Sequence, residues 1–79
     1  MSKVIQKKTK PEDFSAVLNG EKHFELRVDE DDAQVGDRLK LREWNGKYYT
    51  GREIDKKITY VLRNCPEYGL MKGYCILGW

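Results

Sequence analysis

The dipeptide Asn45-Gly46 limits the fold of this chain more than any other feature of the sequence. It lies between Trp44 and Lys47, and the segments on both sides combine aromatic or aliphatic residues with basic ones. Asparagine and glycine both accept the positive φ that the central residues of a type I′ turn require. We therefore expect a hairpin in which a strand over residues 38–44, with its leucines facing inward, returns through a strand over 47–50.

A short helix is predicted over residues 10–19. Thr9 can cap its N-terminus, Pro11 suits its first turn, and Glu12 completes a capping box. Gly20 should end the helix, because glycine adopts the left-handed terminal conformation without strain. The buried side of the helix is predicted to consist of apolar residues at helical spacing, namely Phe14, Val17 and Leu18.

The remainder of the chain is predicted to form strands separated by turns. Gly51 indicates a break or a bulge, and loops are expected over residues 29–32 and 64–69. The strands are expected over residues 4–8, 23–28, 38–44, 47–50, 53–63 and 74–79. This pattern predicts a mainly β (α+β) fold, a small and partly closed barrel with one helix after the first strand. Trp79 is expected to close one end of the barrel.

A chain of 79 residues predicts one domain, residues 1–79, with a thin core and no room for a cofactor domain. No apolar run approaches the ~20 residues of a membrane span, and the lysine-rich start lacks the apolar segment of a signal peptide. We therefore expect a cytoplasmic protein, a monomer, with no cofactor and no membrane partner. Cys65 and Cys75 should be free thiols there, and with His23 as the only histidine a zinc site is not expected.

The charges are distributed unevenly. The net charge is only +2, but residues 29–32 are four consecutive acids, so the rest of the chain carries +6. Residues 38–57 interleave basic side chains with Trp44 and tyrosines. Basic groups that follow phosphates and aromatic rings that stack on bases are typical of surfaces that bind single-stranded nucleic acid. The alternative is an evenly charged, solvated exterior.

The stretch from Gly20 to Arg27 has the pattern G-x-K-x-x-E-x-R, in which Lys22 and Glu25 are the other two fixed positions. Within a strand over residues 23–28, alternate side chains point to opposite faces. Glu25 and Arg27 are predicted to share the polar face, with Lys22 at the entrance of the strand. The opposite face is predicted to enter the core and consists of Phe24, Leu26 and Val28.

This pattern resembles the signature of the ASCH domains (activating-signal-cointegrator homology), which belong to the PUA-like superfamily of small RNA-binding barrels. Four further segments are similar to a compact bacterial and phage subfamily of mostly hypothetical proteins: residues 34–39, 41–44, 49–54 and 73–78. The resemblance covers essentially the whole chain. It implies a PUA-like barrel and RNA binding, and for a few members of the superfamily the hydrolysis of modified nucleosides.

Three functions are compatible with these features. The first is an RNA- or nucleotide-binding module with a basic cleft beside the motif, and Gly20, Lys22, Glu25 and Arg27 are expected at the mouth of this cleft. The further candidate binding residues are Arg42, Trp44 and Arg52. There Glu25 is expected to orient a neighbouring cation or to accept a hydrogen bond from a base amine. The second is a small hydrolase that acts on a modified nucleoside or RNA. The third is a protein-interaction domain.

The hydrolase is the less favoured of the first two functions. The amidohydrolase relatives that the motif resembles carry a threonine, the proposed nucleophile, where Glu25 stands here, and they use the lysine that Lys22 matches. Loss of the hydroxyl removes that nucleophile. Catalysis would then depend on Lys22 and on Glu25 as a general base toward water. A non-enzymatic role is therefore favoured.

Overall fold

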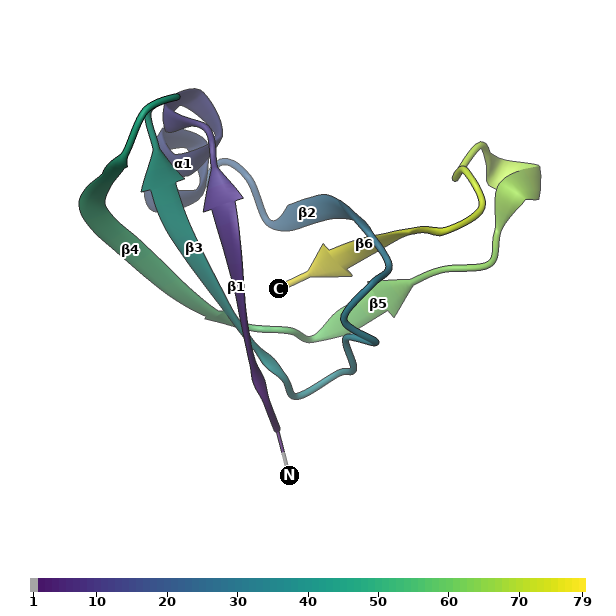
Figure 1. Ribbon diagram of the computed structural model, residues 1–79. Coiled ribbons are helices and arrows are strands. Elements are labelled where there is room, and N and C mark those ends of the chain that lie inside the picture. Colours follow the sequence, from purple (N-terminus) through teal and green to yellow (C-terminus); the bar gives the residue numbers. More distant parts are fainter. Residues whose placement is uncertain (1) are drawn as a thin grey trace.

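The computed structural model describes residues 2–79 and contains two three-stranded sheets and one α-helix (Figure 1). The sheets have the strand orders β1-β3-β4 and β2-β6-β5, and within residues 2–79 they share no strand pairing. The mainly β fold with its helix after the first strand is therefore confirmed, whereas the partly closed barrel stays a prediction. In chain order the elements are β1 (Val4–Thr9), α1 (Pro11–Leu18), β2 (Phe24–Val28), β3 (Arg38–Trp44), β4 (Tyr49–Lys57), β5 (Tyr60–Leu62), the 3₁₀ turn η1 (Pro66–Tyr68) and β6 (Tyr74–Gly78).

The core lies between the two sheets. In the first sheet β1 runs parallel to β3, which pairs antiparallel with β4. Leu39 and Leu41 point inward from β3, as predicted, and are 0% exposed. Cys75 packs into the same cluster from β6, and burial, followed by the nearby carboxylate of Asp29, raises the pKa of its thiol. No helix within residues 2–79 has the length and apolar character needed to cross a membrane.

The strand predicted over residues 53–63 is divided between the two sheets. β4 belongs to the first sheet and β5 to the second, and Ile58 and Thr59 carry the chain from one to the other. The N–H of Ile58 donates to the carbonyl of Asp37 at 2.8 Å, and the N–H of Thr59 donates to that of Gly78 at 2.8 Å. The crossing is thus anchored in both halves. The register of β3 with β4 shifts beside Gly51, whose φ is +95°, so a bulge lies where it was predicted.

The hairpin at Asn45-Gly46 is present, but its turn is not type I′. Gly46 has a φ of +101°, whereas Asn45 is not among the residues with positive φ. The loop spans residues 45–48. Oδ1 of Asn45 accepts hydrogen bonds from the backbone N–H groups of Lys47 at 2.9 Å and Tyr48 at 3.0 Å. These side-chain bonds stabilise a longer loop than the sequence predicts.

The helix α1 lies close to its predicted position, but Thr9 does not cap it. Thr9 belongs to β1, is 2% exposed, and its hydroxyl has no hydrogen-bond partner within residues 2–79. The N-cap is Lys10, and no side chain caps the helix there. Phe14 and Val17 are buried as predicted, whereas Leu18 is 56% exposed. The apolar stripe of the helix is therefore narrower than its spacing indicates.

The strand β2 turns the opposite face toward the interior from the predicted one. Glu25 is only 4% exposed, and Arg27 is half-buried. Phe24, Leu26 and Val28, which were predicted to enter the core, are 48%, 54% and 50% exposed. Alternation along a strand defines two faces but does not determine which one is buried. The predicted orientation of β2 is therefore wrong, and the charged residues of the motif point inward.

The acidic loop at residues 29–32 is neutralised by two partly buried cations. Nζ of Lys7 lies 2.9 Å from Glu30 and 2.6 Å from Asp31, and Nε of Arg63 lies 2.8 Å from Asp29. Burial lowers the pKa of Lys7, but its hydrogen bonds and ion pairs with Asp31 and Glu30 outweigh that effect and raise the pKa above its ordinary value. The charges of Lys7 and Arg63 are thus neutralised by ion pairs with this loop, and these residues do not contribute to a basic surface.

Asp37 ties the start of the chain to the turn before β3 and makes stability depend on pH. Its carboxylate accepts hydrogen bonds from Nζ of Lys3 at 2.8 Å, the backbone N–H of Lys3 at 3.0 Å and that of Gln34 at 2.9 Å. These bonds lower the pKa of Asp37 from 3.8 to about 2. Because the folded-state pKa is depressed, this stabilisation is present above the unfolded pKa and is lost as the pH falls through the folded one.

We expect the urea concentration at the unfolding midpoint of the wild type to decrease as the pH is lowered from about 5 to about 2. Part of this decrease arises because Asp37 must be protonated in that pH range. The Asp37→Asn variant should be less stable at pH 5 and should lose less stability on acidification. Urea denaturation followed by circular dichroism measures both effects. The same loss of stability in the two proteins would contradict this role of Asp37.

Candidate functional site

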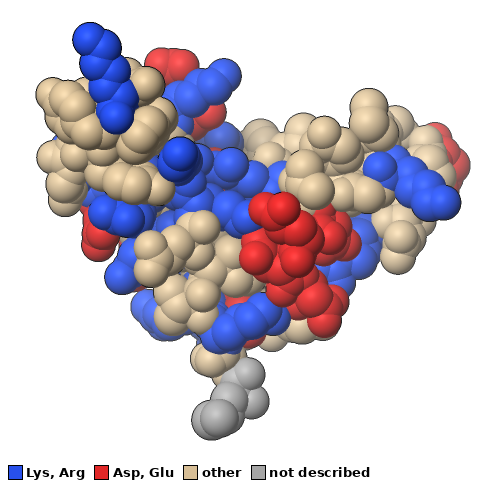
Figure 2. Space-filling view, in the orientation of Figure 1, with Lys and Arg blue, Asp and Glu red and all other residues tan. Residues whose placement is uncertain are grey.

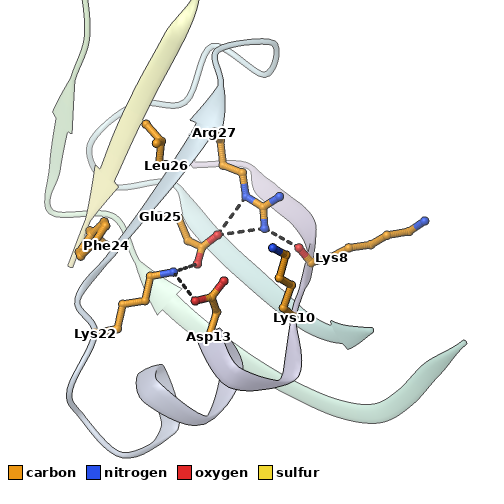
Figure 3. Close-up of a pocket in the computed structure, with 8 residues that line it drawn as sticks. All are labelled: Lys8, Lys10, Asp13, Lys22, Phe24, Glu25, Leu26 and Arg27. Carbon is orange, nitrogen blue, oxygen red and sulfur yellow. Dashed lines mark hydrogen bonds and ion pairs between the residues drawn. The ribbon is translucent and has the colours of Figure 1, made fainter. Parts of the chain in front are cut away.

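A hollow of about 480 Å³ opens beside β2, at the end of β1 and the start of α1 (Figure 3). We call it the basic hollow, because four basic and two acidic side chains line it. Figure 2 shows basic side chains gathered in the depression between the two halves of the molecule, next to an acidic patch. The lining residues are Lys8, Lys10, Asp13, Lys22, Phe24, Glu25, Leu26 and Arg27.

Glu25 is the buried centre of this site. Its Oε1 lies 3.0 Å from Nζ of Lys22, and its Oε2 lies 3.0 Å from Nε and 2.9 Å from Nη2 of Arg27. Lys22 also lies 3.6 Å from Oδ1 of Asp13, and Nη2 of Arg27 donates to the backbone carbonyl of Lys8. A buried carboxylate requires such partners. Of the two roles predicted for Glu25, the geometry supports the orientation of the cations.

The local sequence explains why these three charges meet. Gly20 follows α1 with a φ of +75°, and the backbone N–H of Lys22 donates back to the carbonyl of Ala16 at 3.1 Å, so the chain turns sharply into β2. Glu25 and Arg27 are two residues apart on β2 and therefore share one face. Gly20 itself does not line the hollow. His23 is exposed, and its Nε2 lies 2.8 Å from the Gly20 carbonyl, so it belongs to the turn.

Lys8 and Lys10 are the exposed cations of the basic hollow. Within residues 2–79 Lys10 forms no ion pair, whereas Nζ of Lys8 lies 4.2 Å from the ring centroid of Trp44. From the sequence, both lysines are recognised only as part of a lysine-rich N-terminal segment. Their position beside β2 depends on the tertiary structure and was not predicted. Phe24 adds an aromatic ring to the rim, with Nζ of Lys22 5.4 Å from its centroid.

Arg42 and Trp44 lie outside the hollow but on the neighbouring face of the first sheet. Nε of Arg42 lies 3.1 Å from Oε2 of Glu53, and its guanidinium stacks 3.8 Å over the ring of Tyr49. Trp44 meets Tyr49 edge-on at a centroid distance of 5.0 Å. Lys8 covers Trp44 and also lines the hollow, so it connects the two surfaces.

Arg52 lies apart from the other predicted binding residues. Its Nη1 is 3.7 Å from Oε1 of the buried Glu43, and its guanidinium is 4.8 Å from the ring centroid of Phe14 in α1. Thr50 donates a 2.7 Å hydrogen bond to the same Glu43 oxygen. Arg52 therefore compensates a buried carboxylate and covers the helix. Arg52 does not line the basic hollow, and its role in nucleic-acid binding stays a prediction.

The arrangement around Glu25 argues against its use as a general base. Such a base must contact the water from which it takes a proton. Glu25 is 4% exposed, and both of its oxygens already accept hydrogen bonds from cationic groups. A reacting water would have to displace one of them. Within residues 2–79, no three His, Cys, Asp or Glu side chains are grouped so that they could hold a metal ion.

A known protein family matches almost the whole chain. Residues 5–79, which include every residue that lines the basic hollow, match the family described as "Domain of unknown function (DUF3850)". Over 61 residues the chain is 36% identical to the "Uncharacterized 12.9 kDa protein in GpA 3'region" of Escherichia phage P2. That match covers 77% of this chain but only 56% of the phage protein, so the chain spans little more than half the length of this relative. The chain belongs to the DUF3850 family.

Proposed function

We propose that this protein is a cytoplasmic RNA- or nucleotide-binding module of the ASCH type, with a PUA-like barrel, and that the basic hollow is its ligand site. The observation that carries the proposal is the open hollow of about 480 Å³, whose net positive lining includes an aromatic ring. This volume falls within the range of roughly 300–1,000 Å³ that is usual for small-ligand sites. It suits one nucleotide unit rather than a duplex.

The cations of the hollow divide into two groups. Lys22 and Arg27 are held in place by Glu25 but keep further N–H donors, since a lysine has three and an arginine five. Within residues 2–79, Nη1 of Arg27 makes no hydrogen bond to the protein. Lys10 is exposed and is not neutralised by an acidic partner within those residues. A phosphate that enters the hollow therefore meets two pre-positioned donors and one adaptable cation.

The aromatic residues provide surfaces for bases. Phe24 lies on the rim of the hollow, where a base could stack on its ring. A strand that leaves the hollow along β1 would pass Lys8 and then Trp44. Lys8 would have to move off the ring before a second base could stack there. Trp44 is thus a secondary contact, and Arg42 follows it on the same face.

We expect the protein to bind single-stranded or structured RNA with micromolar or weaker affinity. Neutralisation of about three to five phosphates should make log K fall with log salt at a slope of about −2 to −4. Fluorescence anisotropy with several labelled RNAs over a salt series measures both quantities. No binding of any of these RNAs at low salt would rule the proposal out.

Alanine substitutions should locate the site. Lys22→Ala or Arg27→Ala should weaken binding by about 1–3 kcal/mol, the range for charge-assisted hydrogen bonds. Lys10→Ala leaves the Glu25 ion pairs intact and should reduce the salt slope by about 0.7. Lys72→Ala removes an exposed lysine that does not line the hollow and is the matched control. If the three hollow variants bind RNA as tightly as the Lys72→Ala control does, the hollow is not the site.

Glu25→Gln separates binding from catalysis. It keeps the shape of the side chain but removes the charge that neutralises Lys22 and Arg27. Phosphate binding should therefore be equal or stronger, while the free energy of unfolding should fall by about 1–3 kcal/mol, because two half-buried cations lose their shared anion. RNA titration and urea denaturation test the two effects. Weaker binding by the folded variant would show that Glu25 contacts the ligand, and loss of turnover with intact binding would favour the hydrolase.

A further inference from the structure

The reversed orientation of β2 leaves one face of the second sheet apolar and open. In the register of this sheet, Phe24 lies beside Gly78, and Gly78 lies beside Tyr60. Directly opposed residues share a face. The next row is Leu26, Ile76 and Leu62, and the last is Val28 with Tyr74. We call this surface the outer face, and it consists of Phe24, Leu26, Val28, Tyr60, Leu62, Tyr74, Ile76 and Gly78.

The outer face is exposed and uncharged. Its most exposed member is Tyr60 at 65%, and the three apolar residues of β2 are about half exposed. No Lys, Arg, Asp or Glu stands in its three rows. The other face of the same sheet carries Cys75 and Leu77, which are 2% exposed and belong to the core. The core of this chain therefore lies on one side of the sheet, and the outer face lies on the other.

The segment of residues 68–71, which begins with the last residue of η1, extends this apolar surface. Tyr68 and Met71 are 85% and 68% exposed. A second hollow, of about 370 Å³, lies where this segment meets the sheet, and Leu26, Gly69, Leu70, Met71 and Tyr74 line it. Figure 2 shows an uncharged surface near β6, with basic and acidic side chains toward the outer end of this lobe. A depression that can receive an apolar side chain thus borders the outer face at Leu26 and Tyr74.

The size of this surface exceeds what a monomer usually leaves open. Six residues of the outer face and of the 68–71 segment are about half exposed or more, and together they present on the order of 700 Å² to solvent. The largest apolar patch on a typical monomer is roughly 300–600 Å². A standard specific interface buries about 800 Å² on each partner. The available area is therefore close to that of one complete interface.

We propose that two copies of this chain associate through their outer faces to form a twofold symmetric dimer. An uncharged surface forms no ion pairs with the phosphates of a nucleic acid or with a strongly charged protein. Its partner must therefore itself be apolar. A second copy supplies such a surface in equal size, and a twofold axis brings the same patch of both chains together. Two sheets in this arrangement pack about 10 Å apart with their apolar side chains interdigitated.

Sedimentation equilibrium of nuclease-treated protein tests this proposal. At about 50 µM the mass should be close to twice the chain mass of 9.3 kDa, because interfaces of the standard size have dissociation constants between about µM and pM. The mass should remain at this value in ~1 M salt, where exposed charges are screened beyond ~3 Å. A monomer under these conditions would overturn the proposal and leave the outer face to a different partner. Dissociation by salt would also contradict an apolar interface.

Matched substitutions locate the contact. Val28→Lys with Tyr60→Lys places two charges in the interface and should give a monomer. The control, Val35→Lys with Tyr48→Lys, makes the same two changes at positions that are each 62% exposed and lie outside the outer face, and it should remain a dimer. A dimer that persists in the first variant, or that is lost equally in the control, would overturn the proposal.

A third variant tests the interface even if the substitutions in the strands of the first variant disturb its fold. Tyr68→Lys with Met71→Lys alters side chains that are 85% and 68% exposed, outside the regular strands, so the sheet should keep its structure. Circular dichroism verifies the fold of each variant. If the fold is retained, this pair should weaken dimerisation at least tenfold. Wild-type association of this folded variant would contradict the proposed extent of the interface.

Discussion

The burial of Glu25 between Lys22 and Arg27 determines how the second sheet is oriented. A carboxylate that is 4% exposed is stable only with charged partners beside it. One of these partners, Arg27, stands two residues further along β2, so the polar side of the strand turns inward as a unit. Its apolar side must then face outward. The basic hollow and the outer face are thus two consequences of the orientation of a single strand.

Hydrophobicity alone favours the opposite orientation of β2, and this is why the sequence predicts it. Burial of an apolar side chain is favourable by about 25 cal/mol per Å², and Phe24, Leu26 and Val28 alternate with polar residues as in a half-buried strand. Alternation is symmetrical, however, and a small domain cannot enclose all of its apolar residues. Here Leu39 and Leu41 of the first sheet occupy the core. Which apolar face is left outside is decided by packing between segments far apart in the sequence.

Local signals predicted the fold and the site where local interactions dominate. The strand over residues 38–44, the helix ending before Gly20 and the spacing that unites Lys22, Glu25 and Arg27 all depend on a few consecutive residues. Non-local features escaped prediction. The crossing at Ile58 depends on both sheets, and the approach of Lys10 and Asp13 to β2 depends on how α1 packs. The contact of Arg52 with Glu43 escaped prediction for the same reason, since a strand sequence does not reveal which buried carboxylate a cation neutralises.

The two proposed surfaces meet at β2, and this has a thermodynamic consequence. Phe24 and Leu26 belong to the outer face and also line the basic hollow. A second copy on the outer face therefore reaches the rim where a ligand would enter. If its presence alters the affinity for that ligand, the ligand must alter dimerisation by the same factor, because coupling between two binding equilibria is reciprocal. Such coupling would depend on Phe24 and Leu26, whereas Tyr60 and Lys10 each belong to one surface only.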